Sequence, residues 1–204
     1  MAAIGGFYGG FWDTGEQEAA LEGIFQAQHD RGAVSAGRVW GNLEETAAGG
    51  VAQMHMSARK EQEEHECFWE WRNAGRRAAV LLDGEFYNSG ELRSALKEQG
   101  EKLETDGDAE LAGRMYLCYG PEFVKQLNGV FAMAVLDLDK KMIFLYRDRM
   151  GVKPLFYTFW KDRLYFASRI KGLLACPGIQ PEIGLEGLNE IFSVGPARTP
   201  KISF

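Results

Sequence analysis

Apolar residues recur along the chain with two different spacings. Some stretches have the strand-like period of about two residues, and others have the helical period of about 3.6 residues. Apolar residues at 2–9 lie in a continuous run, which is typical of a buried strand, and the run at 75–90 predicts a strand that ends in an Asp-Gly turn. Short strands are also predicted at 35–42 and 49–57, and hairpins over 129–148 and 154–168, turning at 137–141 and 161–162. These stretches supply the strands of one or more antiparallel sheets.

The helical period occurs in other parts of the chain. Over 14–32 the apolar residues recur at helical spacing and the pattern ends at Gly32. Further helices are predicted at 89–100 with a serine cap, at 107–120 with Asp108 near the start, and at 168–178 and 184–195. The acidic stretch 58–73 fits either a helix or a solvated insertion. Strands, helices, strands and helices in this order predict an α+β fold with helices outside layered sheets, and not an alternating parallel sheet.

Composition narrows the class of protein. The 204 residues are 46% hydrophobic and 25% charged, as in an average globular domain, and no linker divides them. A net charge of -6 argues against a nucleic-acid partner. No apolar run is long enough to cross a membrane, and the first residues lack the layout of a secretory signal. The three scattered cysteines favour reduced thiols and a cytoplasmic location over a disulfide framework.

Two short stretches have both a structural and a functional interpretation. "LLDGEFYNSGEL" (81–92) is either a turn that leaves a strand or a Gly-Glu turn whose backbone N–H groups face a ligand. In "TDGDAEL" (105–111), Asp108 either caps a helix or holds the ammonium group of a ligand. Both alternatives stay open on local pattern alone.

The remaining candidate sites give weaker indications of function. "YRDRMGVKPLFY" (146–157) is interpreted as a charged surface connection between strands. His65 and Cys67 are ligand types, but no second cluster stands at zinc spacing, so no metal site is predicted. The motifs of serine hydrolases, phosphate-binding loops and dinucleotide-binding folds are absent from the sequence.

Taken together, the motifs match one family. "DGEFYNSGELRSALKEQG", "LNGVFAMAVLDLDKKMIFLYRDRMGVKPLFY" and "LYFASRIKGLL" follow one another, and "HDRGAVSAG" (29–37) precedes them. From about residue 2 to 180 the chain resembles the class II glutamine amidotransferase domain of asparagine synthetases, which is of the N-terminal nucleophile type. The resemblance implies a four-layer αββα sandwich of the N-terminal nucleophile hydrolase type.

The resemblance also implies a mechanism, and the sequence departs from it. Such domains release ammonia from glutamine through a cysteine that follows the initiator methionine, with its own amine as base. Here that residue is Ala2. The family's oxyanion hole uses an asparagine side chain and the next glycine N–H, and here the asparagine position holds Asp83; loss of such a donor costs roughly 10²–10³ in rate. The arginine that clamps the substrate carboxylate is missing from "AQMHMSA" (52–58), although Arg59 is near.

Part of the family's glutamine pocket is retained. Gly84, Glu85 and Asp108 stand where the family binds glutamine, and Asp108 corresponds to the residue that holds the substrate ammonium. The sequence therefore predicts a residual binding pocket without catalytic residues. An engineered Cys→Ala exchange would explain Ala2, but it would not explain Asp83 or the missing arginine, so a natural loss of glutaminase chemistry is the better account.

The resemblance extends to what lies beyond the domain. We expect residues 1–185 to form the type 2 amidotransferase-like domain and 186–204 to begin the linker to an ATP-dependent synthetase domain, whose Ser-Gly-Gly-x-Asp-Ser loop is not in these residues. ATP and magnesium are expected only in that missing domain, and no cofactor in this one. The stretch "EIFSVGPARTP" (190–200) is closest to lasso-peptide cyclases, which with β-lactam synthetases keep the domain without its cysteine.

Three functions follow as hypotheses. The first is a degenerate, glutaminase-inactive domain that serves as scaffold or interaction partner of an ATP-dependent amide-forming domain. The second is an active glutamine-hydrolysing asparagine synthetase domain, present here as an inactivated variant. The third is a binding module that reuses the pocket for an amino acid or a peptide. A homodimer is compatible with all three, and neither nucleic acid nor membrane is expected as a partner.

Overall fold

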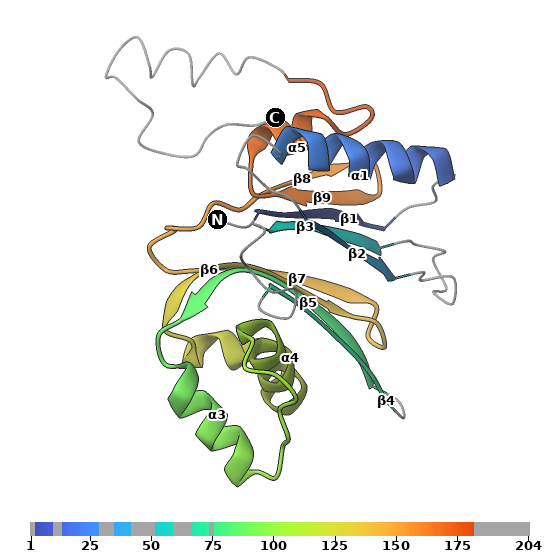
Figure 1. Ribbon diagram of the computed structural model, residues 1–204. Coiled ribbons are helices and arrows are strands. Elements are labelled where there is room, and N and C mark those ends of the chain that lie inside the picture. Colours follow the sequence, from blue (N-terminus) through green and yellow to red (C-terminus); the bar gives the residue numbers. More distant parts are fainter. Residues whose placement is uncertain are drawn as a thin grey trace.

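The computed structural model describes residues 3–9, 14–28, 35–41, 52–58, 67–73 and 76–181. These residues form two antiparallel sheets that face each other, with helices on both outer sides (Figure 1). The first sheet has the order β2-β3-β1-β9-β8 and the second the order β4-β5-β6-β7. This is the αββα sandwich that the resemblance implied, so the predicted fold is confirmed.

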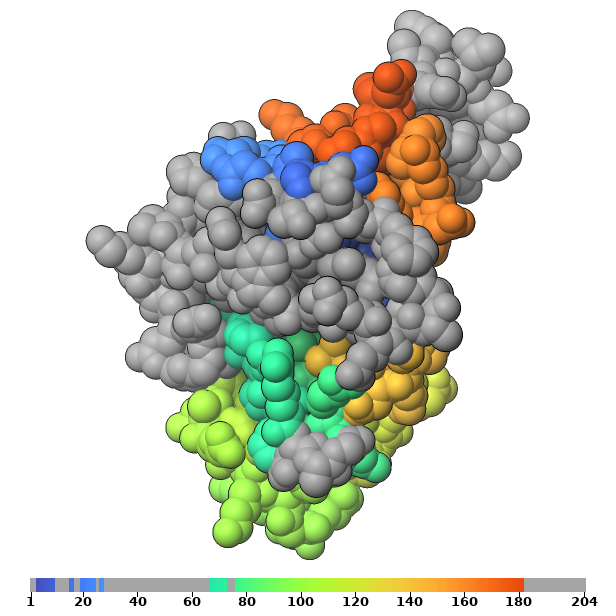
Figure 2. All heavy atoms as spheres, turned by 90° about the vertical axis from the view of Figure 1, so that its right-hand side faces the viewer, coloured from blue at the N-terminus to red at the C-terminus, as the bar shows by residue number. Residues whose placement is uncertain are grey.

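The two ends of the described chain share one half of the molecule. The strands of the first sheet are β1 (Ala3–Tyr8), β2 (Ser35–Gly41), β3 (Ala52–Ala58), β8 (Phe156–Trp160) and β9 (Arg163–Ala167). Helices α1 (Thr14–Gln28) and α5 (Ile170–Leu174) cover its outer face. Figure 2 shows the same division, with blue and orange segments at one end of the molecule and green and yellow segments at the other.

The middle of the chain builds the other half. Its strands are β4 (Phe68–Asn73), β5 (Arg76–Phe86), β6 (Gly129–Asp137) and β7 (Met142–Arg147). Its outer layer contains α3 (Ser89–Glu98), α4 (Asp108–Tyr119) and the 3-10 helix η2 (Gly120–Gln126). The 3-10 helix was not predicted, because a short segment that begins with Gly-Pro resembles a loop as much as a helix.

Strand β5 is long and uninterrupted because both of its faces are buried. Leu81 packs into the core between the two sheets, whereas Val80 and Leu82 pack against α4 and its neighbours. A strand that is covered on both sides has a continuous run of apolar residues in its sequence. This is the pattern from which β5 was predicted. The predicted Asp-Gly turn is wrong, since β5 runs through Asp83 and Gly84 and ends at Phe86.

Three further expectations need correction. The later part of the acidic stretch forms strand β4, and is neither a helix nor a solvated insertion, because Trp69 packs against buried residues of α4 and Arg114 of α4 lies over the Trp71 ring. Helix α3 begins at Ser89, but its N-cap residue is Asn88 and no side chain caps it. Helix α4 has Gly107 as its N-cap, so Asp108 is the first helical residue and not the cap. The predicted helix at 184–195 lies outside the described residues.

Candidate functional site

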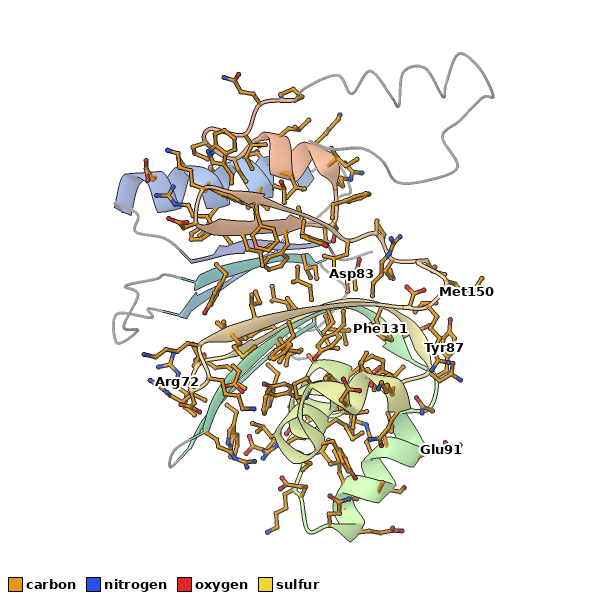
Figure 3. The ribbon with its side chains drawn as sticks, turned by 180° about the vertical axis from the view of Figure 1, so that it is seen from behind. Arg72, Asp83, Tyr87, Glu91, Phe131 and Met150 are labelled. Carbon is orange, nitrogen blue, oxygen red and sulfur yellow. The ribbon has the colours of Figure 1, made fainter. Side chains whose placement is uncertain are left out.

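The candidate site is at the end of β5, to which the resemblance assigns the family's Asn-Gly-Glu segment. Asp83, Gly84 and Glu85 pair with Ala132, Phe131 and Val130 of β6. Because side chains alternate along a strand, Asp83 shares the inner face with Leu81 and points between the two sheets. Figure 3 shows Asp83 in that space.

Asp83 is a buried acid that is held in an ion pair. Its side chain is 1% exposed, and its Oδ1 accepts a hydrogen bond from Nζ of Lys153 at 2.7 Å. The Lys153 side chain is itself only 16% exposed. Since a buried charge is tolerated only with a partner, the two residues form a unit. The interpretation of 146–157 as a surface connection is therefore wrong for Lys153.

The loop before Lys153 is fixed by a second buried acid. The Asp148 carboxylate accepts hydrogen bonds from the backbone N–H groups of Val152 at 2.9 Å and Lys153 at 3.0 Å. Although burial opposes ionisation, the backbone N–H groups of Lys153 and Val152 hold the pKa of Asp148 below its usual value. Arg147 adds hydrogen bonds to the carbonyls of Gly151 and Lys153. This loop aims Lys153 at Asp83.

Gly84 is required by the close approach of β6. Its φ of +143° lies where side chains are rarely accommodated, and a Cβ there would be 1.9 Å from the carbonyl oxygen of Val130. A glycine at this position is therefore needed for the packing of β5 on β6. Glu85, the next residue, is exposed.

The Asp108 carboxylate interacts with groups outside its own helix. Its Oδ2 accepts a hydrogen bond from the backbone N–H of Phe86 at 2.7 Å, and its Oδ1 lies 3.6 Å from the guanidinium of Arg93. Burial raises the pKa of Asp108, and the nearby Glu85 raises it further, although the Phe86 N–H and Arg93 act in the opposite direction. The carboxylate therefore joins the start of α4 to the end of β5.

The loop before α4 is held on both sides, which fixes the position of Asp108. Arg93 donates hydrogen bonds to the carbonyls of Thr105, Asp106 and Gly107. Glu110, which is 1% exposed, accepts hydrogen bonds from the backbone N–H groups of Glu104 and Thr105. Lys153 and Arg93 are the site residues that sequence reasoning missed, because no local pattern indicates where a long basic side chain ends.

The structure places only some of the predicted site residues. It brings Asp83, Gly84 and Glu85 to one end of β5 and ties Asp108 to the next residue, Phe86. Ala2 and Arg59 lie outside the described residues, so the nucleophile and clamp positions keep their sequence-based interpretation. The backbone of β3 (52–58) pairs with β1, with Ser57 opposite Ala3.

A hollow of about 460 Å³ lies beside the site, on the outer side of β6. Tyr87, Phe131 and Met150 line it, and Figure 3 shows these three at one end of the second sheet. Neither Asp83 nor Asp108 contributes to its wall. Asp148 and Val152, from the loop that positions Lys153, also line this hollow.

Within the described part of the chain, the other residues that could bind a metal or act as a nucleophile give weaker indications of a site. No group of three or more metal-ligating side chains occurs there. Cys67 and Cys176 are buried free thiols and Cys118 is an exposed one, while His65 lies outside the described residues. None of the helices in these ranges is long and apolar enough to cross a membrane.

Comparison with known proteins agrees with the fold and the motifs. The profile of the glutamine amidotransferase domain matches residues 1–204. Asparagine synthetase [glutamine-hydrolyzing] 3 of Bacillus subtilis is 41% identical over 121 residues, which are 59% of this chain and 20% of that protein. A putative asparagine synthetase of Methanocaldococcus jannaschii is 33% identical over 118 residues, 57% of this chain and 22% of the relative. The matches span about a fifth of the length of these relatives.

A solved structure supports the same fold. Glutamine phosphoribosylpyrophosphate amidotransferase of Bacillus subtilis, in complex with ADP and GMP, superposes with a TM-score of 0.63 at 17% sequence identity. The superposition covers 85% of this chain and 43% of that one. By motif, by sequence similarity to asparagine synthetases and by fold, the chain belongs to the glutamine amidotransferase domain family.

Proposed function

We propose that this chain is a degenerate amidotransferase domain without glutaminase activity, which serves as scaffold or interaction domain for an ATP-dependent amide-forming domain. The observation that carries the proposal is the buried ion pair of Asp83 and Lys153, at the position that the resemblance assigns to the oxyanion hole. An ionised carboxylate has no N–H to donate, and it repels the negative charge that develops on the amide oxygen.

Lys153 does not replace the missing donor. Its ammonium group lies 2.7 Å from Asp83, so its charge is already neutralised by that carboxylate. The nucleophile is missing as well, because Ala2 stands at the position that the resemblance assigns to cysteine. Two separate requirements of the reaction therefore fail.

The environment of Asp108 supports the same proposal. The carboxylate that would hold the substrate ammonium already has the Phe86 N–H and the Arg93 guanidinium as partners. A ligand ammonium group would have to compete with Arg93 for it. The residual pocket is thus better explained as a retained structural element than as a functioning site.

The relatives support one kind of attached domain. Several are asparagine synthetases that are much longer than this chain, which supports an ATP-dependent synthetase domain as partner in the whole protein. ATP and magnesium would bind to that domain. The lasso-cyclase branch remains a prediction from the stretch 190–200.

Ammonia release from glutamine tests the proposal. The purified protein is compared with Asp108→Ala and with Glu104→Ala, a matched removal of an exposed carboxylate on the adjacent loop. We expect no glutamine-dependent ammonia from any of the three. Turnover in the unaltered protein that Asp108→Ala abolishes and Glu104→Ala preserves would disprove the proposal.

A restored nucleophile separates the alternatives. If the chain is an inactivated form of a working enzyme, Ala2→Cys alone should release ammonia. On our proposal it stays inactive while Asp83 occupies the oxyanion position, and only the double variant Ala2→Cys, Asp83→Asn can gain turnover. Calorimetry with glutamine, asparagine and aspartate tests the binding-module alternative, for which we expect no heat of binding.

A further inference from the structure

Strand β8 is the outermost strand of the first sheet. Its recorded partner is β9, with Thr158 opposite Tyr165, and no backbone hydrogen bond to another described segment is recorded for it. An open edge of this kind presents N–H and C=O groups that another strand can pair with.

The register shows which backbone groups face the open side. Trp160 and Arg163 flank a two-residue turn, so they form a hydrogen-bonded pair across the hairpin. The pattern alternates along the strand, and the groups of Thr158 therefore also point to β9. The N–H and C=O groups of Tyr157 and Phe159 point outward.

The same two residues expose large aromatic side chains. Tyr157 is 62% exposed and Phe159 is 69% exposed, and their rings form an edge-to-face pair at 6.1 Å. They lie on the face of the sheet that carries the buried Phe166, which is the partner of Tyr157 in β9. The apolar layer between the sheets thus continues to an uncovered edge.

Nothing in β8 blocks this edge. The strand "FYTFW" (156–160) contains no charged residue and no proline, which are common means of protecting an edge from pairing. An open, aromatic and uncharged edge is therefore suited to receive another strand.

Near its end, the described chain passes the last residue of β8. Gly178 packs on the indole of Trp160, since a Cβ on Gly178 would lie 2.7 Å from Nε1 of that ring. The last described residue, Pro181, follows shortly after. The chain therefore passes the turn end of β8 three residues before Pro181.

We propose that the open edge of β8 pairs with an extended stretch of this chain's own segment 182–204. A second copy of the chain is a poorer occupant, because one short strand buries far less than the roughly 800 Å² per partner of a stable interface. A tethered segment needs no such area, since its effective concentration at the edge is high. The proposal is independent of whether the domain has lost glutaminase activity.

The sequence of the segment is compatible with this pairing. Residues 201–204, "KISF", alternate polar and apolar side chains, which places Ile202 and Phe204 on one face of a strand. These two would cover Tyr157 and Phe159. At about 3.3 Å per residue the segment is long enough to run from Pro181 past the whole of β8.

Hydrogen exchange of the outward amides tests the pairing. In the 204-residue chain we expect the N–H groups of Tyr157 and Phe159 to exchange at least about tenfold more slowly than in a chain shortened to residues 1–181. The N–H of Thr158, which points to β9, should be protected in both chains and reports that the hairpin is folded.

A substitution provides a second test of the pairing. Phe159→Lys places a charge on the edge and should remove the protection of Tyr157, whereas Met142→Lys, a matched exchange on the edge strand β7, should leave it unchanged. Protection that is equal in the long and short chains would disprove the proposal. Protection that increases with protein concentration would also disprove it, in favour of a second copy.

Discussion

At the scale of single residues, the decisive feature is the buried ion pair at the end of β5. At the position to which the resemblance assigns a neutral donor, this chain has Asp83, and the structure supplies a cation for it in Lys153. Breaking a buried ion pair by removing one partner is costly, whereas replacing both partners is often tolerated. Asp83 and Lys153 should therefore be coupled in their effect on stability.

We predict that Lys153→Met lowers the free energy of unfolding by about 2–4 kcal/mol, because Asp83 loses its ion pair while buried. Adding Asp83→Asn should recover most of that loss, which a double-mutant cycle in urea would measure. Lys125→Met is the matched control, since it breaks an exposed pair with Glu122 and should cost less than about 1 kcal/mol. Additive effects of the two site exchanges would contradict the prediction.

At the scale of elements, the loop between β7 and β8 is more than a connection. The backbone N–H groups of Val152 and Lys153 converge on the Asp148 carboxylate, and this brings Lys153 to the end of β5. Burial of Asp148 opposes its charge, but these N–H groups lower its pKa. A carboxyl whose pKa is lowered by folding stabilises the protein above the pKa of the unfolded chain, and the contribution is lost as the pH falls.

Asp148→Asn should therefore reduce the free energy of unfolding by about 1–3 kcal/mol at pH 7, because hydrogen bonds to a charged group are lost. The difference from the unaltered protein should shrink as the pH falls below about 4, where the unfolded carboxyl is protonated. Denaturation at a series of pH values checks this. Asp162→Asn, on an exposed turn, should change stability at pH 7 by less than about 0.5 kcal/mol. A difference that stays constant with pH would argue against the role of the Asp148 charge.

At the scale of the whole molecule, the core between the sheets joins parts that are distant in sequence. Ile4 and Phe166 of the first sheet pack with Leu81 of the second. The two halves therefore cannot unfold separately without exposing this layer. We expect one cooperative transition for the whole domain.

Phe166→Ala should lower the free energy of unfolding by about 3–5 kcal/mol, because it leaves a cavity in a fully buried layer. Hydrogen exchange should show the amides of Phe7 and Leu81, one in each sheet, losing protection together. Tyr87→Ala removes an exposed ring and should change stability by less than about 0.5 kcal/mol. Loss of protection at Phe7 alone would show that the sheets unfold independently.

The sequence by itself predicted the class of fold, the family and most elements. Buried runs such as the one through Leu81, and helical spacing such as that at 107–120, are local signals that survive in the folded protein. Boundaries were less well predicted where local and tertiary preferences differ. Asp83-Gly84 favours a turn locally, but pairing with β6 keeps it in a strand.

Partners of long and buried side chains were decided only by the tertiary structure. The sequence identified Asp83 and Asp108 as candidates, but it did not indicate Lys153 or Arg93, because their ends lie near residues that are distant in sequence. The assignment of Ala2 and Asp83 to the family's cysteine and asparagine positions comes from the sequence alone and stays a prediction. The partner that neutralises a buried charge depends on distances in space, and so does the edge of a sheet that remains open. Only folding sets those distances.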